Sequence, residues 1–181
     1  QHGTATVALA AVLNACALTG VDPRTSKVGQ IGLGAAGSAI ARLALAYGVR
    51  EVLVTDVSRE AVSALEAEGA RGVDLATLMR ESHIVIATTG RPGLIPKEMV
   101  QKGQVIFALS NPDGEIAPEV ALAAGAAFAG DGRSVNNALA YPGIFKGALE
   151  ARSRAITPEM LIAAAGTIAT HAQPGEIVPS P

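Results

Sequence analysis

The sequence predicts an α/β fold, a mostly parallel, doubly wound sheet with helices on both faces. Short runs of apolar and β-branched residues alternate with helix-like segments along almost the whole chain. Hydrophobic residues make up 49% of the 181 residues and aromatic residues only 3%, so aliphatic side chains supply most of the bulk. Small aliphatic residues suit helices that pack closely on a parallel sheet.

The alternation can be followed segment by segment. Apolar runs bounded by turn residues predict strands at residues 27–31, 51–56, 83–90, 104–109 and 126–130. Helical spacing with capping residues predicts helices at residues 3–18, 35–47, 58–69, 74–82, 96–103, 117–125, 135–154 and 157–172. The helix at 135–154 is expected to break around Pro142 and Gly143.

The chain length fits one domain spanning residues 1–181, with residues 1–25 as a lead-in helix and its connection. The stretch at 5–20 is apolar enough to suggest a membrane segment. It is rich in alanine, contains Asn14 and lacks a basic leader or cleavage site. We therefore interpret it as a buried helix and expect no membrane contact.

Charge and cysteine content narrow the functional classes. Fourteen basic and sixteen acidic residues give a net charge of -2 without a run of either sign, so no nucleic acid partner is expected. The single Cys16 cannot form an internal disulfide, which favours a cytoplasmic location. No close carboxylate or cysteine motif indicates a metal site. His2, His83 and His171 are isolated and are interpreted as structural or surface residues.

A glycine-rich turn is the strongest local motif. Gly32, Gly34 and Gly37 have the GxGxxG spacing, follow a predicted strand and open a predicted helix. Asp56 ends the next strand, nineteen residues after Gly37. This context predicts a Rossmann-like dinucleotide-binding unit. A glycine bend made for packing alone has the same spacing and remains an alternative.

Each residue of the motif has an expected role. Gly32 permits the tight turn, Gly34 lets backbone N–H groups approach a pyrophosphate, and Gly37 lets the helix lie close to the strand. Ala35 and Ala36 begin that helix, whose positive end faces the phosphates.

Asp56 predicts the nucleotide preference. Its carboxylate would accept hydrogen bonds from the adenosine ribose hydroxyls and repel a 2′-phosphate, which favours NAD over NADP. Arg59 lies three residues further and could meet a 2′-phosphate, so NADP is retained as an alternative. The alternative for Asp56 itself is a helix N-cap or loop acid.

Three further segments resemble the malic enzymes, the decarboxylating malate dehydrogenases. They are QHGTATVALAAVLNA at 1–15, IFALSNPDGEIAPE at 106–119 and NNALAYPGIFKGALEARS at 136–153. The resemblance covers the NAD-binding domain of that family and runs the length of the chain. It implies a parent enzyme that oxidises L-malate to pyruvate and CO₂ with reduction of NAD(P).

The resemblance also implies site residues. Asn111, in the SNP turn, would lie beside the nicotinamide ribose and the substrate. Asn136 and Asn137 would hold the nicotinamide carboxamide and the malate or pyruvate carboxyl group, so that Asn111 and Asn137 orient substrate. An amide suits this task because it offers a donor and an acceptor. Taken alone, Asn111 is better explained as an Asx-turn residue, and Asn136 and Asn137 as a helix N-cap pair.

Three threonines complete the expected cofactor contacts. Thr4 matches a family threonine that touches the cofactor. Thr88 and Thr89 belong to TTGRPG, which stands where the family more often has a Ser-Ala-Pro-Gly type of loop.

The resemblance places the remaining machinery outside this chain. Malic enzymes carry a tyrosine acid, a lysine base and acidic ligands of Mg²⁺ or Mn²⁺ in an N-terminal half. Neither Tyr47 nor Tyr141 matches the family acid, and Lys146 is interpreted as a solvated residue. We therefore interpret the chain as a fragment without catalytic residues or metal, inactive alone, with the metal expected only in the full-length parent.

Two other functions stay open at this point. One is a malolactic-type enzyme, which shares the cofactor and metal but releases lactate. The other is a non-catalytic NAD-binding module. A homo-oligomer is expected because the Ala-rich first and last helices offer apolar faces.

Overall fold

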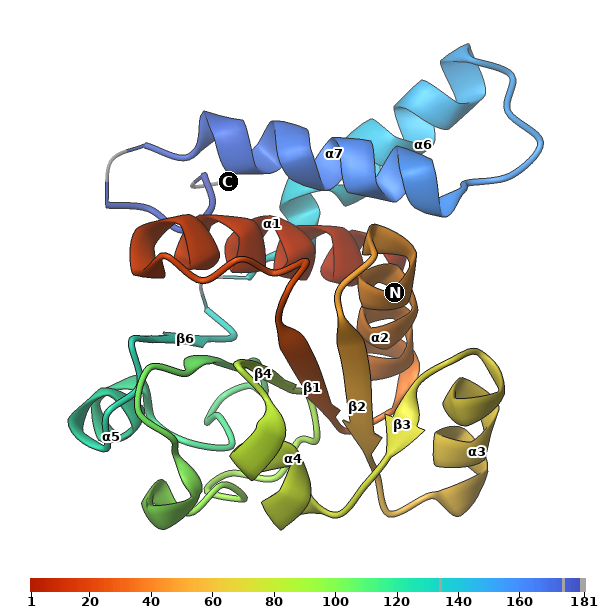
Figure 1. The fold of residues 1–181 in the computed structure, drawn as a ribbon. Helices are drawn as coiled ribbons and strands as arrows, with labels where there is room; N and C mark the ends of the chain where they lie inside the picture. Colours follow the sequence, from red (N-terminus) through yellow and green to blue (C-terminus); the bar gives the residue numbers. More distant parts are fainter. Residues whose placement is uncertain (134, 174, 180–181) are drawn as a thin grey trace.

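Six parallel strands form one sheet in the computed structural model, which describes residues 1–133, 135–173 and 175–179. The strand order is β3-β2-β1-β4-β5-β6, and each neighbouring pair is parallel. The order reverses between β1 and β4, which confirms the predicted doubly wound, Rossmann-like sheet (Figure 1). The strands are β1 Lys27–Ile31, β2 Glu51–Thr55, β3 Arg71–Gly72, β4 Ile84–Ala87, β5 Val105–Ala108 and β6 Phe128–Asp131.

Helices cover both faces of this sheet, as predicted. The α-helices are α1 His2–Thr19, α2 Ala35–Tyr47, α3 Arg59–Ala67, α4 Leu75–Glu81, α5 Pro118–Ala123, α6 Tyr141–Glu150 and α7 Pro158–His171. Strand β4 shows how its residues alternate between the faces. Ile84 and Ile86 join the core cluster with α1, α2 and α7, whereas Val85 and Ala87 join the cluster with α4 and α5.

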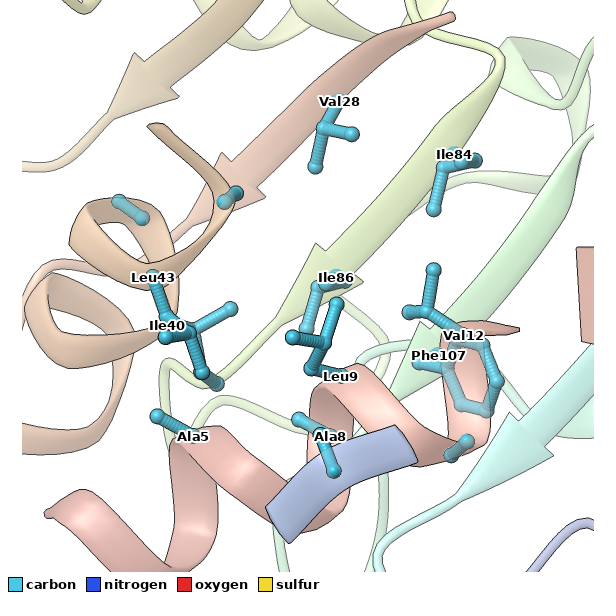
Figure 2. Packing of buried hydrophobic residues seen from close by; sticks show 14 of the residues in the cluster. Ala5, Ala8, Leu9, Val12, Val28, Ile40, Leu43, Ile84, Ile86 and Phe107 are labelled. Carbon is cyan, nitrogen blue, oxygen red and sulfur yellow. The ribbon is translucent and has the colours of Figure 1, made fainter. Parts of the chain in front are cut away.

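Helix α1 lies within the core. Figure 2 shows Leu9 beside Ile86 and Val12 beside Phe107, between the helix and the strands. Helix α7 packs along α1 on the side away from the sheet (Figure 1). By length and composition α1 could cross a membrane, but 61% of it is buried in this structure. The apolar stretch is thus a buried helix, as expected, and it packs into the core.

Two predicted helices differ in the structure. Of residues 96–103, only Lys97–Met99 form a turn of 3₁₀ helix, η1. Val100 is extended, and Gln104 Oε1 accepts the Gln101 N–H at 2.7 Å, which offers that donor a partner outside a helix. Residues 135–154 do break, but at Ala140.

That break separates the 3₁₀ turn η2, Asn137–Leu139, from α6. Pro142 stands in the first turn of α6, where its missing N–H costs no helical hydrogen bond. Pro142 therefore lies at the beginning of a helix. The predicted position of the break, at Pro142 and Gly143, is wrong.

Strand β3 was not predicted. It has two residues, Arg71 and Gly72, which is too short for a periodic pattern. Its pairing with Leu53 and Val54 of β2 defines it.

Candidate functional site

The glycine turn joins β1 to α2 and is built by contacts across the sheet. Gly32 has φ +86°, and a Cβ there would lie 2.8 Å from the Thr88 carbonyl oxygen. A Cβ at Gly37 would lie 1.9 Å from the carbonyl oxygen of Gly32. Both positions therefore require glycine for the fold itself.

Gly34 differs from the other two glycines. It is exposed, has φ -64° at the N-cap of α2, and no atom lies within 4 Å of a Cβ built on it. Packing within the described residues therefore does not require glycine here. Ala35 and Ala36 follow it, and their N–H groups belong to the helix terminus that lacks intrahelical partners. The turn thus presents open space in front of backbone donors, the arrangement that suits a phosphate.

Asp56 follows β2 and is tied to this turn. Its Oδ2 accepts the Leu33 N–H at 2.6 Å, and its Oδ1 accepts the Ser58 N–H at 2.7 Å. Ser58, not Asp56, caps α3 by accepting the Ala61 N–H. Each carboxylate oxygen retains a lone pair, so the group is held in place and still able to accept from a ligand hydroxyl.

A cavity of about 560 Å³, here named the Asp56 cavity, opens between these elements. It is lined by Ile31, Gly32, Leu33, Gly34, Thr55, Asp56, Val57, Ser58, Ala61, Leu75, Thr88, Thr89, Arg91 and Leu94. The basic side chain in this lining is Arg91, from the loop after β4. Arg59 is exposed at the start of α3 and does not line the cavity.

A second cavity of about 550 Å³, the Asn111 cavity, shares Thr88 with the first. Its lining is Thr4, Ala36, Thr88, Leu109, Ser110, Asn111, Gly132, Arg133, Val135, Asn136 and Asn137. Segments far apart in the sequence thus bring together the three asparagines and Thr4, as the resemblance implied. Asn136 also caps η2, where its Oδ1 accepts the Ala138 N–H at 3.0 Å.

Thr88 lines both cavities and Thr89 lines the Asp56 cavity, but their hydroxyl groups have protein partners. Thr88 Oγ1 donates to the Gly32 carbonyl at 3.2 Å and accepts from Gln30 Nε2 at 2.9 Å. Thr89 Oγ1 donates to Glu115 Oε1 at 2.8 Å. Both threonines therefore shape the walls of the cavities as well as lining them.

Two buried polar residues at this edge were not predicted. Gln30 and Glu115 are both 0% exposed, and each joins segments that frame the cavities. In the sequence, Gln30 is a polar residue within the apolar strand KVGQI. Glu115 is a polar residue that follows the SNP turn. That signal alone does not distinguish burial from a solvent-facing position.

Other reactive side chains have structural partners. Burial, with a smaller contribution from the charge of Asp22, raises the pKa of the Cys16 thiol to about 11, so it is not a thiolate at neutral pH. Tyr47 lies beneath the Arg24 guanidinium, and Tyr141 packs against Phe145 with the two rings tilted by 44°. In the described residues no group of three or more His, Cys, Asp or Glu side chains could hold a metal ion.

The predicted structural role of the histidines agrees with their contacts. His83 Nδ1 accepts the Lys27 N–H at 3.1 Å, and His171 Nδ1 lies 2.8 Å from the Thr167 carbonyl oxygen. Lys146 is exposed on α6, with Glu150 at 3.9 Å.

The strand order, the glycine turn and the paired cavities define a dinucleotide-binding domain of the Rossmann type. Two family models match the chain. They are described as the D-isomer specific 2-hydroxyacid dehydrogenase NAD binding domain, at residues 6–92, and the malic enzyme NAD binding domain, at residues 130–179.

Similarity to known proteins distinguishes between these two families. NAD-dependent malic enzyme 1 of Bacillus subtilis is 57% identical over the whole chain. The crystal structure of an NAD-dependent malic enzyme from Thermotoga maritima is 36% identical and covers 99% of the chain with a TM-score of 0.86. The chain belongs to the NAD-binding domains of the malic enzyme family.

The chain corresponds to part of these proteins. It spans 42% of the length of the B. subtilis enzyme and 54% of the T. maritima chain. A bifunctional malic/malolactic enzyme of B. subtilis is 38% identical over the whole chain, which spans 50% of that enzyme.

Proposed function

We propose that this chain is the cofactor-binding part of an NAD-dependent malic enzyme, which converts L-malate and NAD⁺ to pyruvate, CO₂ and NADH. The observation that carries the proposal is the meeting of two cavities at Thr88, where the strand order reverses. The Asp56 cavity has the glycine turn and an acid, and the Asn111 cavity has the three asparagines. A dinucleotide laid across this edge would have its adenosine half in the Asp56 cavity and its nicotinamide in the Asn111 cavity.

The cofactor would supply the hydride acceptor, and this chain would hold it. Gly34 and the N–H groups at Ala35 and Ala36 would bind the pyrophosphate. Asp56 would accept from the ribose hydroxyls of the adenosine half.

The residues of the Asn111 cavity would orient the reacting groups. Asn136 would hold the carboxamide of the nicotinamide, Thr4 would touch the cofactor, and Asn111 and Asn137 would orient the carboxyl group of malate. Amide donors orient a carboxylate without exchanging a proton with it, so these residues position rather than transfer protons. We assign the acid, the base and the Mg²⁺ or Mn²⁺ ligands to the rest of the parent polypeptide.

The choice of NAD over NADP rests on Asp56. Its negative charge at the end of β2 opposes a 2′-phosphate in the same cavity. Arg91 also lines that cavity, and its positive charge would favour a 2′-phosphate. Relatives include enzymes named as NAD-dependent and as NADP-dependent, so the preference is a property of the individual chain.

A parallel titration with NADH and NADPH tests this function. The chain contains no tryptophan, so binding is followed through the fluorescence of the reduced nicotinamide. We expect NADH to bind more tightly than NADPH. Failure to bind either would contradict the proposal. In the full-length parent, formation of NADH that depends on malate would establish the reaction.

A malolactic reaction is the second candidate. It is favoured by the 38% identity to the bifunctional malic/malolactic enzyme. It needs the same cofactor site but leaves no net NADH. Assaying lactate and NADH together in the full-length parent separates the two reactions.

A further inference from the structure

A buried carboxylate links a loop that lines the Asp56 cavity to a loop that lines the Asn111 cavity. Glu115 follows β5 and is 0% exposed. Its Oε1 accepts three hydrogen bonds, from the Thr89 N–H at 2.6 Å, the Thr89 hydroxyl at 2.8 Å and the Ser110 hydroxyl at 2.5 Å. Thr89 belongs to the loop after β4 and Ser110 to the loop after β5. One oxygen atom thus fixes both loops.

Each of these loops leads directly to a part of the candidate site. The Thr89 methyl carbon would lie 2.9 Å from a Cβ at Gly32, so Thr89 packs against the phosphate turn. Ser110 precedes Asn111, and its hydroxyl oxygen also accepts the Gly90 N–H at 2.8 Å. Glu115 therefore stands between the turn of the Asp56 cavity and the asparagine of the Asn111 cavity.

Burying a carboxylate here costs more free energy than is needed merely to hold the two loops together. The three donors to Glu115 are neutral, and its Oε2 has no partner among the described residues. A buried carboxylate without a cation bears a large desolvation cost, whereas backbone bonds already join the same loops. The N–H groups of Gly93 and Ile95 donate to the carbonyls of Gly114 and Glu115 at 3.1 and 2.9 Å. Such departures from low-cost burial are expected at functional sites.

We propose that Glu115 is a positioning residue for cofactor binding, which sets the Thr89 loop against the phosphate turn and fixes the loop that carries Asn111. The inference rests on the proposed cofactor function. Glu115 acts through its neighbours and does not itself touch the ligand.

The test compares Glu115→Ala and Glu115→Gln with wild type for the dissociation constant of NADH and the melting temperature. Glu115→Ala is expected to weaken NADH binding at least about tenfold, because both loops lose their common acceptor. Glu115→Gln keeps an acceptor oxygen at the Oε1 position and is expected to restore binding to within about threefold of wild type.

Gln104→Ala is the matched control for a structural effect. Gln104 is 2% exposed and also bridges segments, since its Nε2 donates to the carbonyls of Met79 and Ser82 at 2.6 and 2.8 Å. It lies at the start of β5, at the opposite edge of the sheet. This variant is expected to lower the melting temperature and leave the NADH dissociation constant unchanged.

The outcomes separate this inference from the proposed function. If wild type fails to bind NADH, the proposed function fails and the inference with it. If wild type binds and Glu115→Ala binds equally well, Glu115 has no positioning role and the proposed function stands. Equal loss of binding in Gln104→Ala would also overturn the inference, since stability alone would then explain the effect.

A milder variant keeps the test usable if Glu115→Ala does not fold. Ser110→Ala removes one donor to Glu115 and leaves the carboxylate in place. It is expected to weaken NADH binding, because the loop that carries Asn111 loses one of its bonds to the carboxylate. A folded Ser110→Ala variant that binds NADH as tightly as wild type would contradict the link.

Discussion

At the amino edge of the sheet the charged side chains pair with one another, whereas at the carboxyl edge the polar side chains surround open cavities. Lys27 lies 3.0 Å from Glu51 and 2.9 Å from Glu81, and Arg71 contacts the same two carboxylates at 2.7 and 2.5 Å. At the other edge, the Asp56 carboxylate accepts the backbone N–H groups of Leu33 and Ser58. The ion pairs at the amino edge thus hold neighbouring strands together. The Asp56 carboxylate, which backbone donors hold in place, can still accept a hydrogen bond from a ligand.

The glycine turn repeats this contrast on a smaller scale. Gly32 and Gly37 are required by contacts within the protein, while Gly34 faces open space. Gly32 and Gly37 therefore have a packing role, and Gly34 is the glycine on which the proposed phosphate binding depends. The following predictions test this division.

The largest effect is expected at Gly37. Its replacement by Ala would place a Cβ 1.9 Å from the Gly32 carbonyl oxygen, so helix α2 must move from the sheet. We expect a loss of about 3 kcal/mol or more in the free energy of unfolding, measured by denaturant titration. Gly166→Ala in α7, where a Cβ meets nothing within 4 Å, is the control and should leave stability unchanged or raise it.

Gly34→Val should separate binding from folding. The side chain fits the fold and the backbone angles suit it, so the melting temperature should stay close to that of wild type. The same side chain would fill the space in front of the helix N-terminus, and NADH binding should weaken more than about tenfold. A variant that binds NADH normally would show that no phosphate approaches this turn.

A change of Asp56 should shift the nucleotide preference. Asp56→Asn removes the charge that opposes a 2′-phosphate, and we expect the ratio of NADPH to NADH affinity to rise about tenfold. Arg91→Ala in the same cavity should move the ratio the other way. Parallel titrations measure both, and an unchanged ratio in both variants would exclude this cavity from nucleotide selection.

The smallest effect is expected at the amino edge. Hydrogen bonds from Lys27 and then Arg71 lower the pKa of the Glu81 carboxyl group, and bonds from the same two residues, Lys27 first, lower that of Glu51. These pKa values fall below the ordinary 4.5, so their contribution to stability is present above that pH and is lost as the pH falls through the folded values.

Glu81→Gln tests this pH dependence. The exposed pairs are screened by solvent, so at pH 7 the melting temperature should drop by less than about 3 °C. The difference from wild type should shrink in acid, while NADH binding at pH 7 stays the same. A difference that grows in acid would contradict the assigned sign.

The predictable parts of the site are those encoded by local rules. The strand before Gly32, the helix after it and Asp56 at the end of the next strand follow from chain sterics and periodicity over short stretches. Chain order also fixed which strand ends meet at one edge, because consecutive βαβ units are right-handed. The two 3₁₀ turns, Lys97–Met99 and Asn137–Leu139, were missed because three residues are too few for a helical repeat to separate such a turn from part of a longer helix.

The sequence by itself determined the parallel α/β sheet, the glycine turn before helix α2 and, through three motifs, the family. Only the tertiary structure decided which polar residues are buried and what they join. Glu115 and Thr89 are twenty-six residues apart, and Thr4 comes from α1 whereas Asn137 comes from η2, after the last strand. Their proximity depends on how helices and loops pack on the sheet, a balance of many weak long-range contacts that no short segment encodes.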